Sequence, residues 1–401
     1  MSDRRHESKS LSILFLEPFY GGSHRAFADG LARHSAWEIE VRQLPDRHWK
    51  WRLHGAALTF AEQLERDVAR GRTWDLIVAT SLLDMTDLRS LLSRFMRVPP
   101  LLFYVHETQF DYPLSPGEAR DAQYGFRNLL SIVSSDLTLF NSGSHRRRFF
   151  QEAEQFLSRL PKPIPANLIR RARANSRVLY PGVEVGGEQP EPGTKTRRHG
   201  PPLILWNHRW EHDKDPESFF RVLFDLDRPE LPWRLAVVGE EYSKAPVIFD
   251  EARERLSRRI LRFGYCEKRS EYVQLLEEAD VVVSTARQEN FGIAIVEAIL
   301  AGATPLLPYR LSYPELLPRE THASLLYRGR EELREKLETV LRAPGDYAQA
   351  REVARNARRR DRWRRASRAP WRGRDAHVPR ARRSHSGGRA PAGSAAWERR
   401  C

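Results

Sequence analysis

The chain has 401 residues, 40% of them apolar, and a formal net charge of +14 at pH 7. This length and apolar content fit two globular domains and exclude a disordered protein. No stretch reaches the roughly 20 uninterrupted apolar residues of a membrane span, and no secretion signal opens the chain, so we expect a cytoplasmic protein.

Short apolar runs recur through the first part of the chain, each followed by polar residues and a helical pattern. They cover residues 11–16, 75–79, 101–105 and 137–140. Alternation of this kind predicts a parallel sheet with helices on both faces. The first run leads into Gly21 and Gly22, which predict a tight turn before a helix.

Residues 184–202 are rich in Gly, Pro, Glu and Thr, which is typical of a connection between domains. A second series of apolar runs follows at residues 203–206, 234–239, 260–264 and 280–284. The sequence therefore predicts an α/β protein with two Rossmann-like domains, residues 10–184 and 203–345, joined by a linker over residues 185–202. Ligands of such sheets bind beyond the carboxyl ends of the strands, in the cleft between the halves.

Residues 346–401 are predicted to form an Arg-rich, disordered tail. Residues 351–401 hold 17 arginines against four acids, which leaves a charge of only +1 for the rest of the chain (14 − 13). From Arg351 onward there is no Leu, Ile, Phe or Tyr, so the segment cannot form a core of its own. An RNA-binding arm, a solvated tail and an out-of-frame translation beginning near Arg355 are three open interpretations.

The only cysteines are Cys266 and Cys401, and neither belongs to a closely spaced pair or a Cys/His cluster. We therefore expect neither a disulfide framework nor a zinc site. No Asp/Glu cluster has the spacing of a metal site either, so a metal cofactor is not expected.

The first chemical motif follows the predicted strand at residues 203–206. Arg209 and Lys214 emerge from a loop that leads into a helix, where side-chain cations and free N–H groups can neutralise a diphosphate. Such cations suit a reaction in which a nucleoside diphosphate departs with growing negative charge. A surface ion-pair network with Glu211 and Asp213 is the alternative.

The second motif follows the strand at residues 280–284. Glu289 lies in a loop with Asn290, Phe291 and Gly292, and Glu297 lies about two turns down the next helix. Both carboxylates are able to accept hydrogen bonds from sugar hydroxyls. Two glutamates at this spacing are also common by chance.

Taken together in this order, the two motifs resemble those of the retaining glycosyltransferases of family four, which have the GT-B fold. The resemblance implies that Arg209 and Lys214 contact the donor diphosphate, Glu289 the transferred sugar and Glu297 the ribose. It also implies a donor site that includes Gly21, Gly22, Gly239, Asn290, Phe291 and Gly292.

The N-terminal half is similar to the tRNA-queuosine mannosyltransferases in particular. The matching segments of this half are residues 17–24, 48–52, 106–113 and 123–126. Residues 210–220 of the second half match as well, and the resemblance extends from about residue 11 to residue 342. It implies that mannose passes from GDP-mannose to queuosine in a tRNA anticodon. It further implies a catalytic role for His106, which leaves a strand at the cleft.

For the acceptor, the sequence offers aromatic residues that alternate with cations. Trp49, Lys50, Trp51 and Arg52 are predicted to stack an unpaired base and contact phosphate. We assign His24, Glu107, Gln109 and Tyr112 to the same acceptor side, and Glu107 and Asp111 are the two candidates for a base. The arginine runs at residues 146–148 and 170–173 are able to follow the RNA backbone. Buried tryptophans and solvated helix faces are the alternatives.

Three functions therefore stay open. The leading prediction is mannosyl transfer to tRNA queuosine. A glycosyltransferase of the same fold with a lipid or small-molecule acceptor is the second, and an inactive RNA- or nucleotide-binding protein is the third. The oligomeric state is not predicted.

Overall fold

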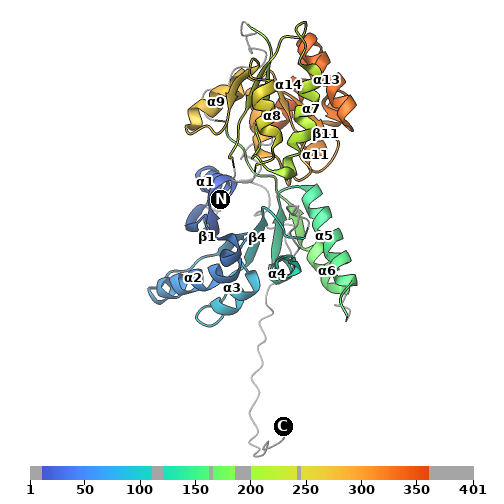
Figure 1. Ribbon diagram of the computed structural model, residues 1–401. Helices are drawn as coiled ribbons and strands as arrows, with labels where there is room; N and C mark the ends of the chain where they lie inside the picture. The colour runs from blue at the N-terminus through green and yellow to red at the C-terminus, as the bar shows by residue number, and fades with distance from the viewer. Residues whose placement is uncertain (1–10, 111–120, 162–165, 186–199, 242–244, 361–401) are drawn as a thin grey trace, which may run out of the picture.

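A computed structural model of the chain describes residues 11–110, 121–161, 166–185, 200–241 and 245–360. Two α/β domains lie one above the other in Figure 1. Each contains a six-stranded sheet whose strand pairs are all parallel. The predicted two-domain α/β architecture is confirmed.

The N-terminal sheet has the strand order β2-β1-β3-β4-β5-β6. Its strands are β1 (Ser12–Tyr20), β2 (Glu38–Pro45), β3 (Leu76–Thr80), β4 (Leu101–Val105), β5 (Leu137–Phe140) and β6 (Ser176–Val178). The helices are α1 (Gly22–His34), α2 (Trp49–Ala69), α3 (Met85–Leu92), α4 (Ala122–Ser134), α5 (Gly143–Ser158) and α6 (Ala166–Ala174).

The C-terminal sheet has the order β12-β11-β10-β7-β8-β9. Its strands are β7 (Leu203–Trp206), β8 (Arg234–Val237), β9 (Ile260–Phe263), β10 (Val281–Val283), β11 (Thr304–Pro308) and β12 (Leu326–Tyr327). The α-helices are α7 (Pro216–Leu226), α8 (Ile248–Arg255), α9 (Arg269–Glu278), α10 (Ile293–Ala301), α11 (Tyr313–Leu316), α12 (His322–Leu325), α13 (Arg330–Arg342) and α14 (Ala348–Arg360). Short 3-10 helices are η1 (His212–Lys214), η2 (Arg319–Thr321) and η3 (Pro344–Tyr347).

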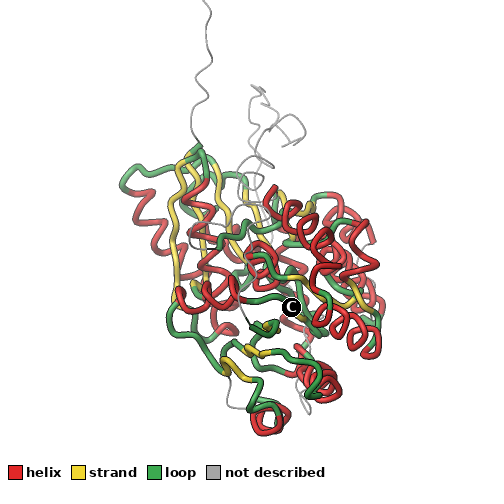
Figure 2. Tube along the Cα trace, turned by 90° about the horizontal axis from the view of Figure 1, so that it is seen from above, coloured by secondary structure: helices red, strands yellow, loops and turns green. Residues whose placement is uncertain are grey.

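Both faces of the central strands of the N-terminal sheet are buried. Along β1, Leu14 and Leu16 belong to one apolar cluster, while Ile13 and Phe15 belong to another on the opposite face. This alternation follows from the two-residue period of a strand. Figure 2, turned by 90° from Figure 1, shows helices on both sides of the strands. The buried sheets hold the loops at their carboxyl ends in fixed positions.

A carboxylate of the C-terminal domain connects the two halves. Glu315 of α11 accepts hydrogen bonds from the backbone N–H of Gly143 at 2.7 Å, from Arg147 at 3.1 Å and from the hydroxyl of Tyr180 at 3.2 Å. Gly143 is the first residue of α5, whose N-terminal end favours a negative charge. Two members of the arginine run at residues 146–148, Arg147 and Arg148, therefore contribute to the contact between domains, since Arg148 also donates to Gln288.

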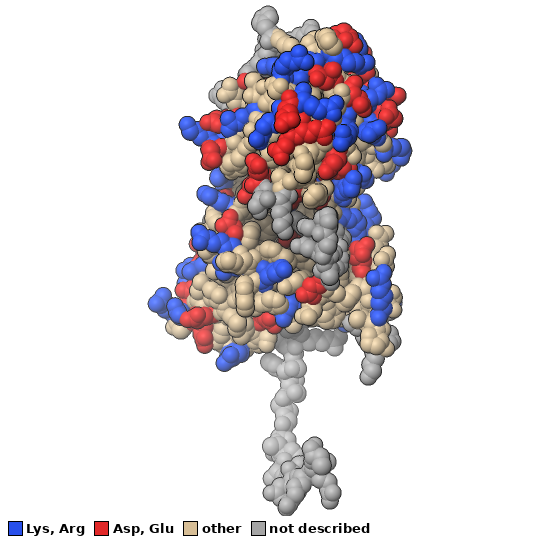
Figure 3. Space-filling model, in the orientation of Figure 1, with Lys and Arg blue, Asp and Glu red and all other residues tan. Residues whose placement is uncertain are grey.

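The folded part continues beyond residue 345, where the sequence predicted the tail to begin. Helix α14 covers Ala348–Arg360, and Ala354 and Arg355 are buried. The remaining tail residues, 361–401, lie outside the described residues. On the face seen in Figure 3, Lys and Arg are mixed with Asp and Glu over both domains, as the small net charge of the body requires.

Candidate functional site

The donor-side site begins where β7 ends. The chain continues through Arg209 into η1, which carries Lys214, and α7 starts at Pro216. Between them Asp215 has a left-handed backbone with φ of 52°. Asp215 therefore forms the turn at which η1 ends and α7 begins.

Lys214 lies buried at the centre of this loop. Its Nζ donates to the carbonyl of Gln288 at 2.8 Å and lies 3.1 Å from Asp213 Oδ2 and 3.6 Å from Glu289 Oε2. Burial alone would lower the pKa of Lys214, but Glu289 and Asp213 outweigh it, and the net pKa is raised above 10.5. Lys214 is therefore a buried cation, and the structure brings it together with Glu289.

Arg209 lies nearer the surface, with 42% of its side chain exposed, and pairs with Glu211 at 3.0 Å. Burial, then the positive charges of Lys214 and Arg209, hold the pKa of His208 well below its usual value. The ion pairs with Glu211 and Asp213 that the sequence offered as an alternative are thus present. They coexist with the Lys214–Glu289 contact, because the cations have several donors.

The loop after β10 supplies Glu289 and Asn290. The Asn290 side chain donates to the backbone carbonyl of His106 at 3.2 Å, across the two domains. Gly292 has φ of 97° at the start of α10, which favours glycine. Phe291 is buried there. The loop therefore faces the N-terminal domain as well as Lys214.

Glu297 lies on α10 in a network that the sequence did not predict. It accepts hydrogen bonds from Arg269 and from the hydroxyl of Tyr272, the latter at 3.1 Å. Burial is the largest influence on the pKa of Glu297 and raises it, while Arg269 and then Tyr272 act against burial. The only sequence signal for this network is the three-residue spacing of Arg269 and Tyr272, which places both side chains on one face of α9.

Gly239 has a packing role that is visible in the structure. It follows β8, and a side chain there would collide with the backbone carbonyl of His208. Gly239 thus lets the loops after β7 and β8 approach each other, and it shapes the donor side through the backbone.

In the N-terminal domain, the glycine turn leads into α1 as predicted. Gly21 precedes the helix, and a side chain there would strike Asp46, whereas Gly22 has φ of 48° and open space on that side. His24, two residues further on, stacks its ring on that of His106, with centroids 4.0 Å apart and planes 31° apart. The turn thus brings His24 against a residue from the end of β4.

A third group, Glu17, completes this cluster and was not singled out by the sequence. Its Oε1 lies 2.9 Å from His24 Nδ1. One ligand atom each from Glu17, His24 and His106 falls within 4.8 Å of the others, so the set is also a candidate cation site. No other such group of His, Cys, Asp or Glu occurs among the residues that the structure describes.

The aromatic and cationic residues at the start of α2 gather near Tyr124 of α4. Lys50 Nζ lies 5.6 Å from the ring of Trp49 and 5.8 Å from that of Tyr124. Trp51 is 75% exposed. Arg52 donates to the carbonyl of Pro45 at 3.2 Å. An exposed indole beside a cation is able to stack on a base.

Glu107 and Gln109 follow His106 in the loop after β4, and their side chains meet at 3.4 Å. The backbone N–H of Gln109 also donates to Asn128 at 2.9 Å, which ties the loop to α4. Asp111 and Tyr112 lie outside the described residues. The arginines at residues 170 and 171 are exposed, and Arg173 pairs with Glu154.

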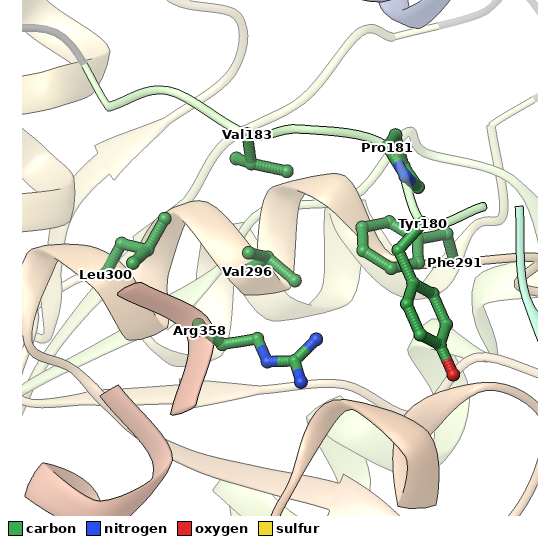
Figure 4. A pocket seen from close by; sticks show the side chains of 7 residues that line it. All are labelled: Tyr180, Pro181, Val183, Phe291, Val296, Leu300 and Arg358. Carbon is green, nitrogen blue, oxygen red and sulfur yellow. The ribbon is translucent and has the colours of Figure 1, made fainter. Parts of the chain in front are cut away.

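A separate pocket lies behind the donor loop (Figure 4). It is lined by Tyr180, Pro181, Val183, Phe291, Val296, Leu300 and Arg358. Because it shares only Phe291 with the predicted donor site, we attribute it to the packing of α14 against α10 and the connecting segment.

Comparison with solved structures shows the fold. HepE from Anabaena, in complex with UDP and glucose, superposes with a TM-score of 0.61 and 16% identity over 88% of this chain and 95% of that chain. Sucrose-phosphate synthase from Thermosynechococcus elongatus gives 0.62 and 16% over 89% and 96%. The chain has the GT-B fold.

Comparison of sequences shows the family. Residues 12–183 match the profile described as tRNA-queuosine alpha-mannosyltransferase N-terminal, and residues 189–360 match that of glycosyl transferases group 1. The tRNA-queuosine alpha-mannosyltransferase of Drosophila melanogaster is 32% identical over 354 residues, 85% of this chain and 89% of that protein. A GDP-mannose:cellobiosyl-diphosphopolyprenol alpha-mannosyltransferase of Xanthomonas campestris is 28% identical over 137 residues, about a third of each chain. The chain is a glycosyltransferase and belongs to the tRNA-queuosine alpha-mannosyltransferase family.

Proposed function

We propose that this chain transfers mannose from GDP-mannose to queuosine in the anticodon of tRNA, with retention of the anomeric configuration. The main observation behind this proposal is the sequence similarity to the Drosophila relative, which extends through both domains. The donor sugar nucleotide is supported by the Xanthomonas relative, whose name contains GDP-mannose. Because tRNA is the acceptor, we propose the cytoplasm as the location.

The donor-side residues suit the departure of a diphosphate. As the bond from the anomeric carbon to the phosphate oxygen breaks, negative charge grows on the leaving group, and Lys214 and Arg209 stabilise it. The acceptor hydroxyl oxygen bonds to the same face of the sugar, and its proton passes to the leaving phosphate. In this proposal Glu289 binds the sugar, Glu297 the ribose, and His106 contacts the sugar from the N-terminal domain.

The acceptor side is proposed around the start of α2. Trp51 is exposed enough to stack on an unpaired anticodon base, and Lys50 adds a charge for phosphate. His24, Glu107, Gln109 and Tyr112 complete this side of the proposal. We also propose that the reaction uses no metal cofactor, since the chain's own cations match the charge of the leaving group.

The test is transfer itself. The protein is incubated with GDP-mannose and queuosine-containing tRNA. The tRNA is then digested to nucleosides, whose masses are measured by mass spectrometry. We expect one hexose on queuosine, no product with tRNA that lacks queuosine, and no effect of a chelator. Transfer to a polyprenyl diphosphate without transfer to tRNA would instead support the lipid-acceptor function.

Two variants test the donor site. Lys214→Ala and Glu289→Ala are expected to lower kcat by about 100-fold or more, the usual effect of removing one group that stabilises a transition state. Glu335→Ala, an exposed residue of α13, is the matched control and should retain full activity. Wild-type rates in both donor-site variants would refute the site, and RNA binding without any transfer by the wild type would support the inactive binding protein.

A further inference from the structure

Both carboxylate oxygens of Glu297 are held by side chains of α9. Arg269 donates to Oε1, and the hydroxyl of Tyr272 donates to Oε2 at 3.1 Å. The Glu297 side chain is 11% exposed, whereas that of Arg269 is 53% exposed. A glutamate carboxylate turns easily about its last bond unless its partners fix it. Two donors from one helix therefore set the plane of this carboxylate.

A chain of hydrogen bonds fixes the direction in which Tyr272 donates. The side-chain amide of Asn207, next to the end of β7, donates to the carbonyl of Ala294 and to the hydroxyl oxygen of Tyr272, both at 2.9 Å. Because a carbonyl only accepts, the contact with Ala294 places the NH₂ group of Asn207 on this side. Burial and then the charge of Glu297 raise the pKa of Tyr272 well above 10, so the hydroxyl keeps its hydrogen at neutral pH. That hydrogen is directed to Glu297.

These side chains meet at the edge of the C-terminal sheet where ligands bind. Asn207 follows β7, Arg269 begins the helix after β9, and Glu297 lies on the helix after β10. The carboxyl ends of these parallel strands lie along one edge of the sheet. Lys214, in the loop after β7, lies along the same edge. The group is therefore placed to contact a ligand as well as to join α9 to α10.

The arrangement leaves acceptor positions on both oxygens of Glu297. A carboxylate has about four lone-pair sites, two on each oxygen. Arg269 occupies a site on one oxygen and Tyr272 a site on the other. The remaining sites suit a pair of hydroxyls on adjacent carbons of a sugar ring. The 2′- and 3′-hydroxyls of a ribose are such a pair.

We propose that Tyr272 is a positioning residue for nucleotide binding, which orients the Glu297 carboxylate opposite Arg269 so that both oxygens accept from the ribose hydroxyls of the donor. The inference rests on the proposed function, which assigns Glu297 to the ribose, and it adds the residue that makes this contact selective for a ribonucleotide. A carboxylate that is oriented in advance loses less freedom when the ligand binds. A network that only holds α9 against α10 is the alternative.

The experiment compares two ligands that differ only in those hydroxyls. Calorimetry measures the Kd of GDP and of 2′,3′-dideoxy-GDP for the wild type, Tyr272→Phe and a control. We expect the wild type to bind GDP about tenfold more tightly than the dideoxy nucleotide, as for a hydrogen bond to a charged group. In Tyr272→Phe the binding of GDP should weaken about fivefold, and that of dideoxy-GDP by less than about twofold, because Glu297 then has no hydroxyl to bind.

Tyr347→Phe is the matched control, because it removes the hydroxyl of another buried tyrosine in the same domain. Both Kd values should stay at those of the wild type. Equal weakening of the two nucleotides in Tyr272→Phe would show a purely structural role and overturn the proposal. Unchanged binding of GDP in Tyr272→Phe would overturn it too, as would a wild type that does not distinguish the two nucleotides.

Steady-state kinetics give a second readout. The ribose is remote from the bond that breaks, so Tyr272→Phe should raise the KM for GDP-mannose about fivefold and leave kcat within about twofold of the wild type. A lower kcat with an unchanged KM would contradict the proposal.

Failure of the proposed function would look different. A wild type that prefers GDP to its dideoxy form but transfers no mannose to tRNA would refute the proposed function and leave the role of Tyr272 standing. A wild type that binds UDP and not GDP would refute the proposed donor. The same comparison with UDP and 2′,3′-dideoxy-UDP would then decide the role of Tyr272, since both nucleotides carry the same ribose.

Discussion

Gly239 shows how a single residue without a side chain shapes the donor side. The carbonyl of His208 occupies the position that a side chain at residue 239 would need. His208 is the second residue after β7 and Gly239 is the second residue after β8, two largely buried strands that pair with each other. The loop that carries Lys214 therefore depends on a glycine in a neighbouring loop.

Gly239→Ala is expected to destabilise the protein by about 2 kcal/mol, because the added methyl group collides with the backbone carbonyl of His208 and one of the two backbone segments must move aside. The KM for the donor should rise as well. Urea unfolding and steady-state kinetics measure both. Gly55→Ala in α2 is the control: nothing lies within 4 Å of its added carbon, so it should stabilise the protein by about 0.5 to 1 kcal/mol. Equal stability of the two variants would contradict the packing role.

The contact between Lys214 and Glu289 could be predicted from the sequence. Each residue follows an apolar run, and β7 and β10 are neighbours in the sheet, so their loops meet at one edge. The position of Glu17 was not predicted, because its carboxylate accepts a hydrogen bond from Thr80, 63 positions away. The ion pair of Glu297 with Arg269 was missed for the same reason: it depends on how α9 packs on α10.

Among the elements, α14 extends the fold into the arginine-rich end of the chain. Its Arg355 is 1% exposed and donates through Nε to the carbonyl of Leu300 at 3.0 Å, near the C-terminal end of α10. A cation is favourable at that end of a helix. Arg358 lines the pocket behind Phe291 (Figure 4). An arginine-rich sequence thus packs on the back of the helix that carries Glu297.

Arg355→Ala is expected to cost about 2 kcal/mol of unfolding free energy, the typical contribution of a hydrogen bond to a charged group, and more if a cavity remains. Thermal and urea unfolding measure the loss. Arg342→Ala, whose side chain is 49% exposed on α13, should change stability by less than about 0.5 kcal/mol. Equal effects of the two substitutions would show that α14 is not held by Arg355.

The strands that the sequence did not predict lie mostly at the sheet edges. β2 and β6 are the outer strands of the first sheet and β12 is an outer strand of the second. β2 is half exposed and alternates charged with apolar residues, and β12 has only two residues, so none forms the continuous apolar run of a central strand. β11 was also missed, because its prolines weaken the strand pattern.

At the scale of the whole molecule, Glu315 fixes how the two domains face each other. Its carboxylate receives three donors from the N-terminal domain, and Asn290 makes a further contact with the carbonyl of His106. The residues assigned to donor and acceptor come from different halves. The arrangement of the halves therefore decides whether the site is assembled.

Glu315→Ala is expected to shift the domains toward an open arrangement, because three donors lose their acceptor. We expect a larger radius of gyration in small-angle scattering without nucleotide, and a kcat/KM about tenfold lower, which corresponds to 1.4 kcal/mol. Glu331→Ala, with 69% of its side chain exposed, is the control. A scattering profile and rate like the wild type would show that other contacts suffice.

The three oxygens around Lys214 have a consequence for the order of events. An ammonium group has three hydrogens, and here the carbonyl of Gln288 and the carboxylates of Asp213 and Glu289 already surround it. A phosphate arriving at this nitrogen must take the place of one of them, and Glu289 is the most distant at 3.6 Å. When the nucleotide binds, its phosphate would then replace the Glu289 carboxylate beside Lys214. The released carboxylate would be able to bind the sugar.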